Sequence, residues 1–307
     1  MTASADVLFS IFATDLLPVF IIAGAGFLLG RFASVDVRAV SRITFHAFAP
    51  TLVFNLLITS TVDGEAFAKM ALFYVLVAGS AGLMARVAAI PLRLSRVETT
   101  ALLLVVVCSN SGNYGLPVAL LAFGPDALAH ATVYFLTSSA FSYSGGVLLA
   151  ASGRRSLRQA VAGLTRVPAL YGGVAAAVIL ALGIQLPPGV ARPISMMADA
   201  SLPLMILVLG MQLERVTMPS RPGIVAVAVL LSLVATPLAA FGLARLVGLE
   251  GPALQAGVLQ SSMPSGVITT ILALEFDTLP NFVTSVVCVS TLLSPLTVTL
   301  LIAYLQG

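Results

Sequence analysis

The sequence predicts an all-α integral membrane protein with ten transmembrane helices, arranged as two inverted five-helix repeats. Three observations lead to this fold class: a strongly apolar composition, a regular alternation of apolar stretches with charged loops, and proline landmarks that recur about half a chain apart. The fourth and ninth helices are further predicted to be broken and to cross each other.

The composition excludes a soluble domain. Only 9% of the 307 residues are charged and 59% are hydrophobic, whereas a soluble domain carries about 25% charged residues. Because each span of about 20 residues needs only a short loop, ten spans use up the whole length. No large extramembrane enzyme fits, and the short arginine clusters between apolar stretches argue against a nucleic-acid partner.

The chain also lacks the residues that common membrane enzymes and pumps require. Two cysteines, Cys108 and Cys288, and two histidines are too few for a metal framework, so no cofactor and no metal site are expected. No Gly-x-Ser-x-Gly elbow and no phosphate loop occur, which argues against an enzyme and against a primary pump. The first thirty residues lack the charged start of a cleavable signal peptide and are interpreted as the first span.

Apolar windows bounded by charge, glycine or proline define the individual spans. They lie at 8–30, 43–61, 68–90, 99–122, 127–150, 168–186, 194–212, 223–246, 252–275 and 280–304. The first repeat then covers residues 1–153 and the second, inverted repeat covers residues 154–307, with no soluble domain.

Positive charge divides the loops between these spans into two alternating sets. One set holds twelve arginines, and the other holds only Lys69, Arg192 and Arg245. Because cytoplasmic loops carry the excess of lysine and arginine, the first set is predicted to be cytoplasmic. Both termini are therefore expected outside the cytoplasm, in a multi-pass protein of the cell (inner or plasma) membrane.

Two pairs of prolines mark the repeat. Pro50 and Pro203 are 153 residues apart, and Pro117 and Pro264 are 147 residues apart, so each half has one proline in its second span and one in its fourth. Since five spans is an odd number, the second half enters the membrane from the opposite side. The alternative is a chance match among the 17 prolines.

The fourth and ninth spans carry polar and helix-breaking residues where the membrane centre should be, reading CSNSGNYGLP over 108–117 and QSSMPSG over 260–266. Proline removes a backbone donor, and freed backbone groups are tolerated in hydrocarbon only inside protein or beside a watery cavity. Half-helix N-termini carry partial positive charge, which suits a carboxylate. The predicted substrate-binding residues are Asn110, Asn113, Tyr114, Pro117, Ser261, Ser262, Pro264 and Ser265. The alternative is that the asparagines and serines only join helices by hydrogen bonds.

Two titratable residues precede the second-span prolines by four positions, namely His46 before Pro50 and Asp199 before Pro203. A charged Asp inside a bilayer costs about 2.5 to 3.5 kcal/mol, so Asp199 is expected to face the protein interior and to couple transport to a proton or another ion. The alternative is a solvated carboxylate beside Arg192. His46 is the second candidate for coupling, with a helix-packing histidine as its alternative.

Asn110 seven residues before Pro117, together with the run Met263–Val267 and several other segments, resembles the auxin efflux carrier family, including its bacterial malate or malonate permease members. The similarity covers nearly the whole chain, and these two features are among its most specific. The other matching segments are Leu17–Phe20, Gly24–Gly30, Ala49–Phe54, Leu202–Leu204, Leu209–Met211 and Glu275–Phe276.

This resemblance implies a ten-span fold similar to that of bile acid symporters and sodium/proton antiporters, with a scaffold and a crossover-bearing transport domain. It also implies organic-anion substrates, an elevator-like motion, and a role for Asn110 opposite the substrate carboxylate. Ser265 and Thr269 stand where plant carriers have glutamine and proline, which argues against a bulky indole ligand.

The residues and the resemblance together predict a secondary carrier of small organic anions, with carboxylates favoured. A membrane channel or a non-transporting receptor is the alternative. The sequence leaves open which anion is carried, in which direction, and whether a proton, sodium or no ion is coupled to it. A homodimeric state is left open as well.

Overall fold

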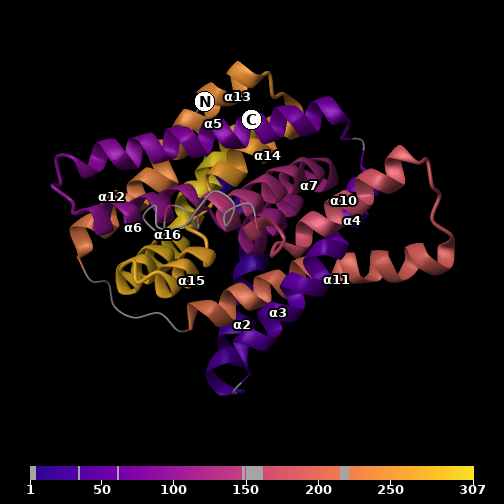
Figure 1. The fold of residues 1–307 in the computed structure, drawn as a ribbon, viewed down its shortest axis with the longest axis horizontal. Coiled ribbons are helices and arrows are strands. Elements are labelled where there is room, and N and C mark those ends of the chain that lie inside the picture. Colours follow the sequence, from indigo (N-terminus) through magenta and orange to yellow (C-terminus); the bar gives the residue numbers. More distant parts are fainter. Residues whose placement is uncertain (1–4, 34, 61, 147–148, 150–161, 215–220) are drawn as a thin grey trace.

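The computed structural model describes residues 5–33, 35–60, 62–146, 149, 162–214 and 221–307. Within these residues the regular structure is helical, and the only β pairing is one isolated antiparallel bridge between Ser109 and Ser265. The protein is therefore all-α, as expected (Figure 1).

The first half of the chain folds into helices whose starts are fixed by side-chain caps. Asp63 accepts a hydrogen bond from the Ala66 amide at 2.8 Å, and Ser95 and Glu98 form a capping box that begins the next helix. In chain order the elements are α1 (Ala5–Ile11), η1 (Phe12–Leu16), α2 (Leu17–Phe32), α3 (Val37–Ile43), η2 (Thr44–Phe48), α4 (Ala49–Thr59), α5 (Gly64–Ala89), α6 (Arg96–Val107), η3 (Ser111–Gly115), α7 (Leu116–Phe141) and η4 (Ser142–Gly146).

In the second half, six of the helices have a proline within their first two residues, where its missing amide costs nothing. The elements are α10 (Pro168–Ala181), α11 (Pro188–Leu213), α12 (Pro222–Leu230), η5 (Leu231–Ala235), α13 (Thr236–Val247), α14 (Gly251–Ser261), α15 (Ile268–Glu275) and α16 (Pro280–Gln306).

Four of the π-helical turns share one cause. The turns η1, η2, η3 and η5 each run directly into an α-helix whose second residue is a proline: Pro18, Pro50, Pro117 and Pro237. A proline has no N–H to donate and its ring crowds the preceding turn, so the hydrogen-bond ladder widens there. Within the run 108–117, where the fourth span was expected to break, the break lies at 108–110 and the helix reforms from Ser111.

Seven described helices are long and apolar enough to cross a membrane, where ten spans were expected. The expected fourth span is divided into α6 and the start of the run Ser111–Gly146, and the expected fifth span forms the rest of that run, beyond a kink at Gly124 with φ 81°. The expected sixth span is the shorter apolar helix α10, and the expected ninth span is divided into α14 and α15. The described residues thus form a multi-span helical membrane protein.

The helices gather into two groups (Figure 1). The first group contains α2, α4, α10 and α11, which pack on one another, and we call it the scaffold group. Its helices approach so closely that a Cβ at Gly26 would overlap the Leu207 carbonyl oxygen, and one at Gly210 would overlap that of Ala23. Arg31 and Glu214 join the ends of α2 and α11 by an ion pair of 3.3 Å.

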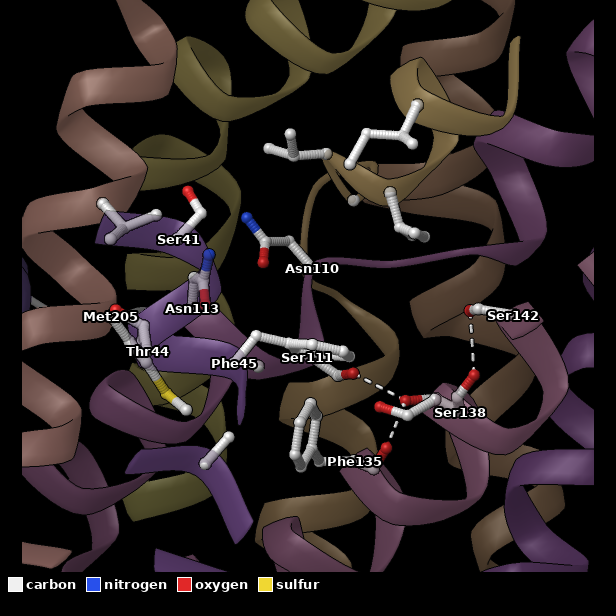
Figure 2. A pocket seen from close by; sticks show the side chains of 18 of the residues that line it. Ser41, Thr44, Phe45, Asn110, Ser111, Asn113, Phe135, Ser138, Ser142 and Met205 are labelled. Atoms are coloured by element: carbon white, nitrogen blue, oxygen red, sulfur yellow. Dashed lines mark hydrogen bonds between the residues drawn. The ribbon is translucent and has the colours of Figure 1, made fainter. Parts of the chain in front are cut away.

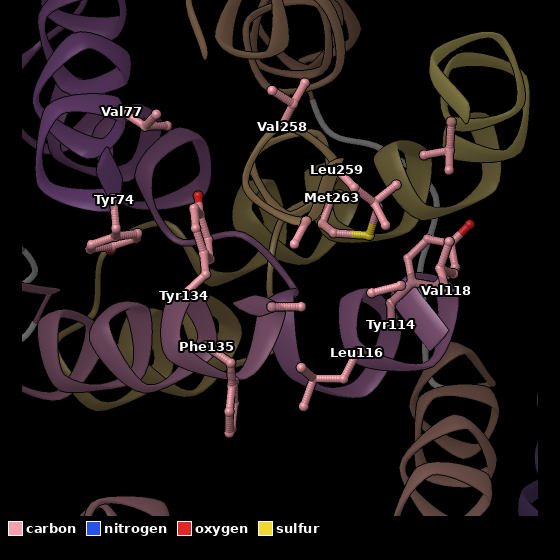
Figure 3. Packing of buried hydrophobic residues seen from close by; sticks show 14 of the residues in the cluster. Tyr74, Val77, Tyr114, Leu116, Val118, Tyr134, Phe135, Val258, Leu259 and Met263 are labelled. Atoms are coloured by element: carbon pink, nitrogen blue, oxygen red, sulfur yellow. The ribbon is translucent and has the colours of Figure 1, made fainter. Parts of the chain in front are cut away.

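The second group contains α5, α6, α7 and α12 to α16, and we call it the crossover group because it carries both helix breaks. Its core lies between α5, α7 and α14, where Tyr74 meets Tyr134 edge to face at 5.1 Å beside Val258, Leu259 and Met263 (Figure 3). This buried contact joins α5 to α7, and α14 packs against α7 as well. The two helix breaks are therefore held in a rigid setting.

Candidate functional site

The two helix breaks cross each other inside the crossover group. The Asn110 backbone N–H donates to the Pro264 carbonyl oxygen at 2.7 Å, and the Gly266 backbone N–H donates to the Cys108 carbonyl oxygen at 2.8 Å. These two bonds form the Ser109–Ser265 bridge and satisfy backbone groups that have left their helices. Each break thus supplies the hydrogen-bond partners that the other break needs in the membrane interior.

The hydroxyl of each bridge serine caps a half-helix that belongs to the other break. The Ser265 hydroxyl donates to the Val105 carbonyl oxygen near the end of α6 at 2.7 Å. The Ser109 hydroxyl donates to the Gln260 carbonyl oxygen near the end of α14 at 3.5 Å. The last carbonyls of a helix have no partner within it, so these hydroxyls cap two helix ends across the crossing.

We predict that Ser265→Ala lowers the free energy of unfolding by about 1 to 3 kcal/mol, because it leaves the buried Val105 carbonyl without its partner. Ser285→Ala is the matched control, since the buried Ser285 hydroxyl donates only within its own helix, to the Asn281 carbonyl oxygen. Thermal unfolding of the purified variants in detergent measures both. Equal melting temperatures for the two would contradict the cap across the crossing.

A cavity of about 380 Å³ lies against the crossing, between the two helix groups. The starts of both half-helices that follow the breaks line it, at 109–113 and 266–268. The remaining lining residues are Ser41, Arg42, Thr44, Phe45, His46, Ala49, Phe135, Ser138, Ser139, Ser142, Tyr143, Arg166, Met205, Val208, Gln212 and Ile271. Two helix N-termini with their partial positive charge therefore meet at one cavity.

Asn110 is the polar residue that the crossing presents most directly to this cavity. Its side chain is only 7% exposed, and its amide nitrogen Nδ2 has no hydrogen-bond partner among the described residues. Figure 2 shows Asn110 and Asn113 pointing into the cavity on the side of Ser41 and Met205. A buried amide donor without a partner is costly, so this atom is suited to an acceptor on a ligand.

The charged residues that line the cavity are all basic. Arg42 and Arg166 lie at its wall, and His46 lies beside them, whereas no Asp or Glu belongs to the described lining. The His46 ring nitrogen Nδ1 donates to the Arg42 carbonyl oxygen at 3.0 Å. Fixed positive charge without a carboxylate favours an anion over a cation in this space.

A row of hydroxyls on the last turn of α7 and the start of η4 forms another wall of the cavity, which was not among the predicted site residues. Ser111 and Ser138 share a hydrogen bond of 2.7 Å between their hydroxyls, and the Ser142 hydroxyl donates to the Ser138 carbonyl oxygen at 2.8 Å (Figure 2). The spacing of Ser138 and Ser142 by four residues places both on one helix face. That spacing in an otherwise apolar span was the available signal.

Of the eight predicted substrate-binding residues, the structure brings two, Asn110 and Asn113, to the cavity. Tyr114 is fully buried instead, against Phe20 at 6.1 Å between ring centroids and with its hydroxyl 3.2 Å from that of Ser294. The other five predicted residues do not line the cavity; they begin a helix or form hydrogen bonds within the crossover group. They are Pro117, Ser261, Ser262, Pro264 and Ser265.

The two residues predicted for ion coupling lie in different surroundings. Asp199 is exposed on α11 and does not line the cavity, so its expected inward orientation is not found in this structure. The helix turns it outward because the inner face of α11 is taken by residues such as Ala198 and Leu202. His46, in contrast, lines the cavity.

Comparison with known proteins places this arrangement among transporters. A family model described as "Membrane transport protein" matches residues 144–302, about half of the chain. A protein named "Uncharacterized transporter" from Methanothermobacter thermautotrophicus is 26% identical over 87% of this chain and 88% of its own length. A second uncharacterized transporter, from Methanocaldococcus jannaschii, is 25% identical over 65% of this chain and 66% of its own length.

Proposed function

The chain belongs to the membrane transport protein family, and from this premise we propose that it is a secondary carrier of small organic anions, with carboxylates as the favoured class. The binding site in this proposal is the cavity at the crossing of the two helix breaks. The observation that carries it is the buried Asn110 amide nitrogen, which has no protein partner and lies in a cavity whose charged lining is basic.

The proposed binding mode follows from the donors around this cavity. A carboxylate accepts hydrogen bonds only, and its charge strengthens each bond that it accepts. Asn110 and Asn113 offer side-chain amides, and the N-terminal turns after both breaks add positive helix ends. Arg42 and Arg166 attract the anion to the same space.

The proposed mechanism is alternating access by an elevator-type motion of the crossover group along the scaffold group. In this proposal the chain forms ten spans in two inverted repeats, so that the state open on the other side is the pseudo-symmetric counterpart of this one. The hydrogen bond from the Ser201 hydroxyl to the Phe48 carbonyl oxygen supports the repeat, because it joins residues 153 apart and hence at equivalent positions of the two halves.

The alternatives are a membrane channel and a non-transporting receptor. The described lining of the cavity comes from the crossing and from helix segments on one side of it, the side of Arg42 and Arg166. A polar lining on one side only favours a carrier over a channel. Beyond the crossing, Tyr114 is buried and packs against Phe20 of the scaffold group. A channel needs a polar lining that continues to both faces of the membrane.

Flux through proteoliposomes tests the proposal. We expect saturable uptake of at least one labelled carboxylate from a panel of acetate, malonate, succinate and benzoate, with counterflow when the same anion is loaded inside. Non-saturating flux without counterflow would indicate a channel. Binding without any flux would indicate a receptor, and the absence of both would overturn the anion site.

The proposed topology places the cavity mouth in the cytoplasm and both termini outside. In a chain whose Cys108 and Cys288 are replaced by alanine, we predict that Ala162→Cys is labelled by an impermeant thiol reagent only after the cells are opened. Asp63→Cys and Gly189→Cys should be labelled in intact cells. Labelling of Ala162→Cys from outside would reverse this orientation. The loop around Gly153, which the sequence analysis also places inside, lies outside the described residues.

A further inference from the structure

We propose that His46 is a proton-binding site linked to the anion site, so that the carrier takes up its anion together with a proton. This inference deepens the proposed function and rests on it. It begins from the position of His46 in η2, where its ring lines the cavity beside the crossing. The sequence alone favoured a histidine that only packs between helices over this role.

One ring nitrogen of His46 is committed and the other is available. Nδ1 lies 3.0 Å from the Arg42 carbonyl oxygen, and since a carbonyl can only accept, Nδ1 must carry the hydrogen. In the neutral ring Nε2 is then an acceptor, and protonation turns it into a donor with a positive charge. The backbone contact thus fixes the atom at which the proton binds.

The groups around His46 make its protonation depend on an anion. The elements packed against η2 are α3, α4, α10 and α11, and their charged side chains at the cavity are Arg42 and, just before α10, Arg166. Arg38 on α3 and Arg192 and Asp199 on α11 are exposed and lie outside the lining, α4 has no charged residue, and Tyr143 adds a neutral phenol beside Phe45. A positive charge on His46 would add to those of the two guanidinium groups and attract an anion into the same cavity.

The described lining contains no carboxylate that could take this role. Histidine is also the side chain whose charge ordinarily changes between about pH 5 and 8. By linkage, a proton that strengthens anion binding by some factor is itself bound more tightly by the same factor when the anion is present. The sign is therefore fixed: anion affinity is highest when His46 is protonated and falls as the pH rises.

Equilibrium binding to the full-length protein in nanodiscs tests the link, with acetate, malonate, succinate and benzoate as probes at about pH 6.5 and about pH 8.5. We expect the wild-type affinity to be about three- to tenfold weaker at the higher pH, tenfold being the equivalent of a one-unit shift in the proton equilibrium. His46→Gln should show the weak affinity at both pH values. His46→Lys, which keeps a positive charge, should show the strong affinity at both.

His130 provides the matched control, because it is the second of the two histidines and does not line the cavity. His130→Gln should keep the wild-type pH dependence. With only two histidines, the imidazole NMR signals of the unmodified protein give a second measurement, in which the anion should change the signals of His46 and leave those of His130 in place.

Two results would overturn the proton site while the anion site stands: pH-dependent binding that survives in His46→Gln, or His46 NMR signals that do not respond to a bound anion. If no probe binds to the wild-type protein at either pH, the proposed function itself fails, and this inference fails with it.

Discussion

Asn110→Ala is expected to weaken carboxylate binding by about ten- to a hundredfold while the protein stays folded. The Asn110 amide nitrogen is buried in the cavity without a protein partner, so its removal takes away one hydrogen bond to the ligand and none within the protein. A hydrogen bond to a charged group contributes about 1.5 to 3 kcal/mol, and each 1.4 kcal/mol is about tenfold in affinity. Equilibrium binding of the carboxylate that passes the flux test measures the effect.

Two further variants sharpen this experiment. Asn110→Asp keeps the shape of the side chain but places a negative charge before the anion, so it should bind more weakly than Asn110→Ala. Asn281→Ala is the control, because Asn281 is exposed on the first turn of α16 and outside the cavity lining. Wild-type affinity in both Asn110 variants would rule out the proposed contact.

Gly26→Ala is expected to lower the free energy of unfolding by about 1 to 3 kcal/mol, or to prevent recovery of folded protein. Its new Cβ would overlap the Leu207 backbone carbonyl, so α2 and α11 would have to move apart. Gly24→Ala makes the same change two residues away on the same helix, where no atom lies within 4 Å of the added Cβ. That variant should be neutral or more stable by up to about 1 kcal/mol, because alanine favours a helix over glycine.

Thermal stability of the two glycine variants in one detergent provides the comparison. The separation of their melting temperatures isolates the close approach of α2 to α11 from the general effect of alanine on a helix. If Gly26→Ala melted with Gly24→Ala, the helices could not be as close as the structure has them.

The parts of the fold and site that the sequence predicted are those with a strong local cause. Proline, glycine and asparagine in the middle of a membrane span disfavour an uninterrupted helix. The runs at 108–117 and 260–266 therefore predicted two helix breaks. Asn110 stood out because burying a side-chain amide at such a break costs free energy unless another group accepts its hydrogen bond. Composition alone was enough for the membrane-spanning, all-helical class.

The sequence could not predict which way each side chain turns, because that depends on the packed structure. Asp199 lies well inside its predicted span, but in the structure it stands on the face of α11 that points away from the cavity, and it is exposed there. Ser265 lies at the crossing, but its hydroxyl donates a hydrogen bond to the Val105 carbonyl oxygen and not to the cavity. His46 and Ser138 reach the cavity only because helices distant in the chain pack beside the crossing.

The cap from Ser265 to Val105 has a consequence for the making of the protein. Its two residues are 160 positions apart, and a ribosome adds about 5 to 20 residues per second, so the first break is complete roughly 8 to 32 s before its partner is synthesised. During that interval the carbonyls at the end of α6 and the polar turn with Asn110 have no partner from the second break. The newly inserted first half must therefore be sheltered from lipid, by the insertion machinery or by water, until the second half arrives to complete it.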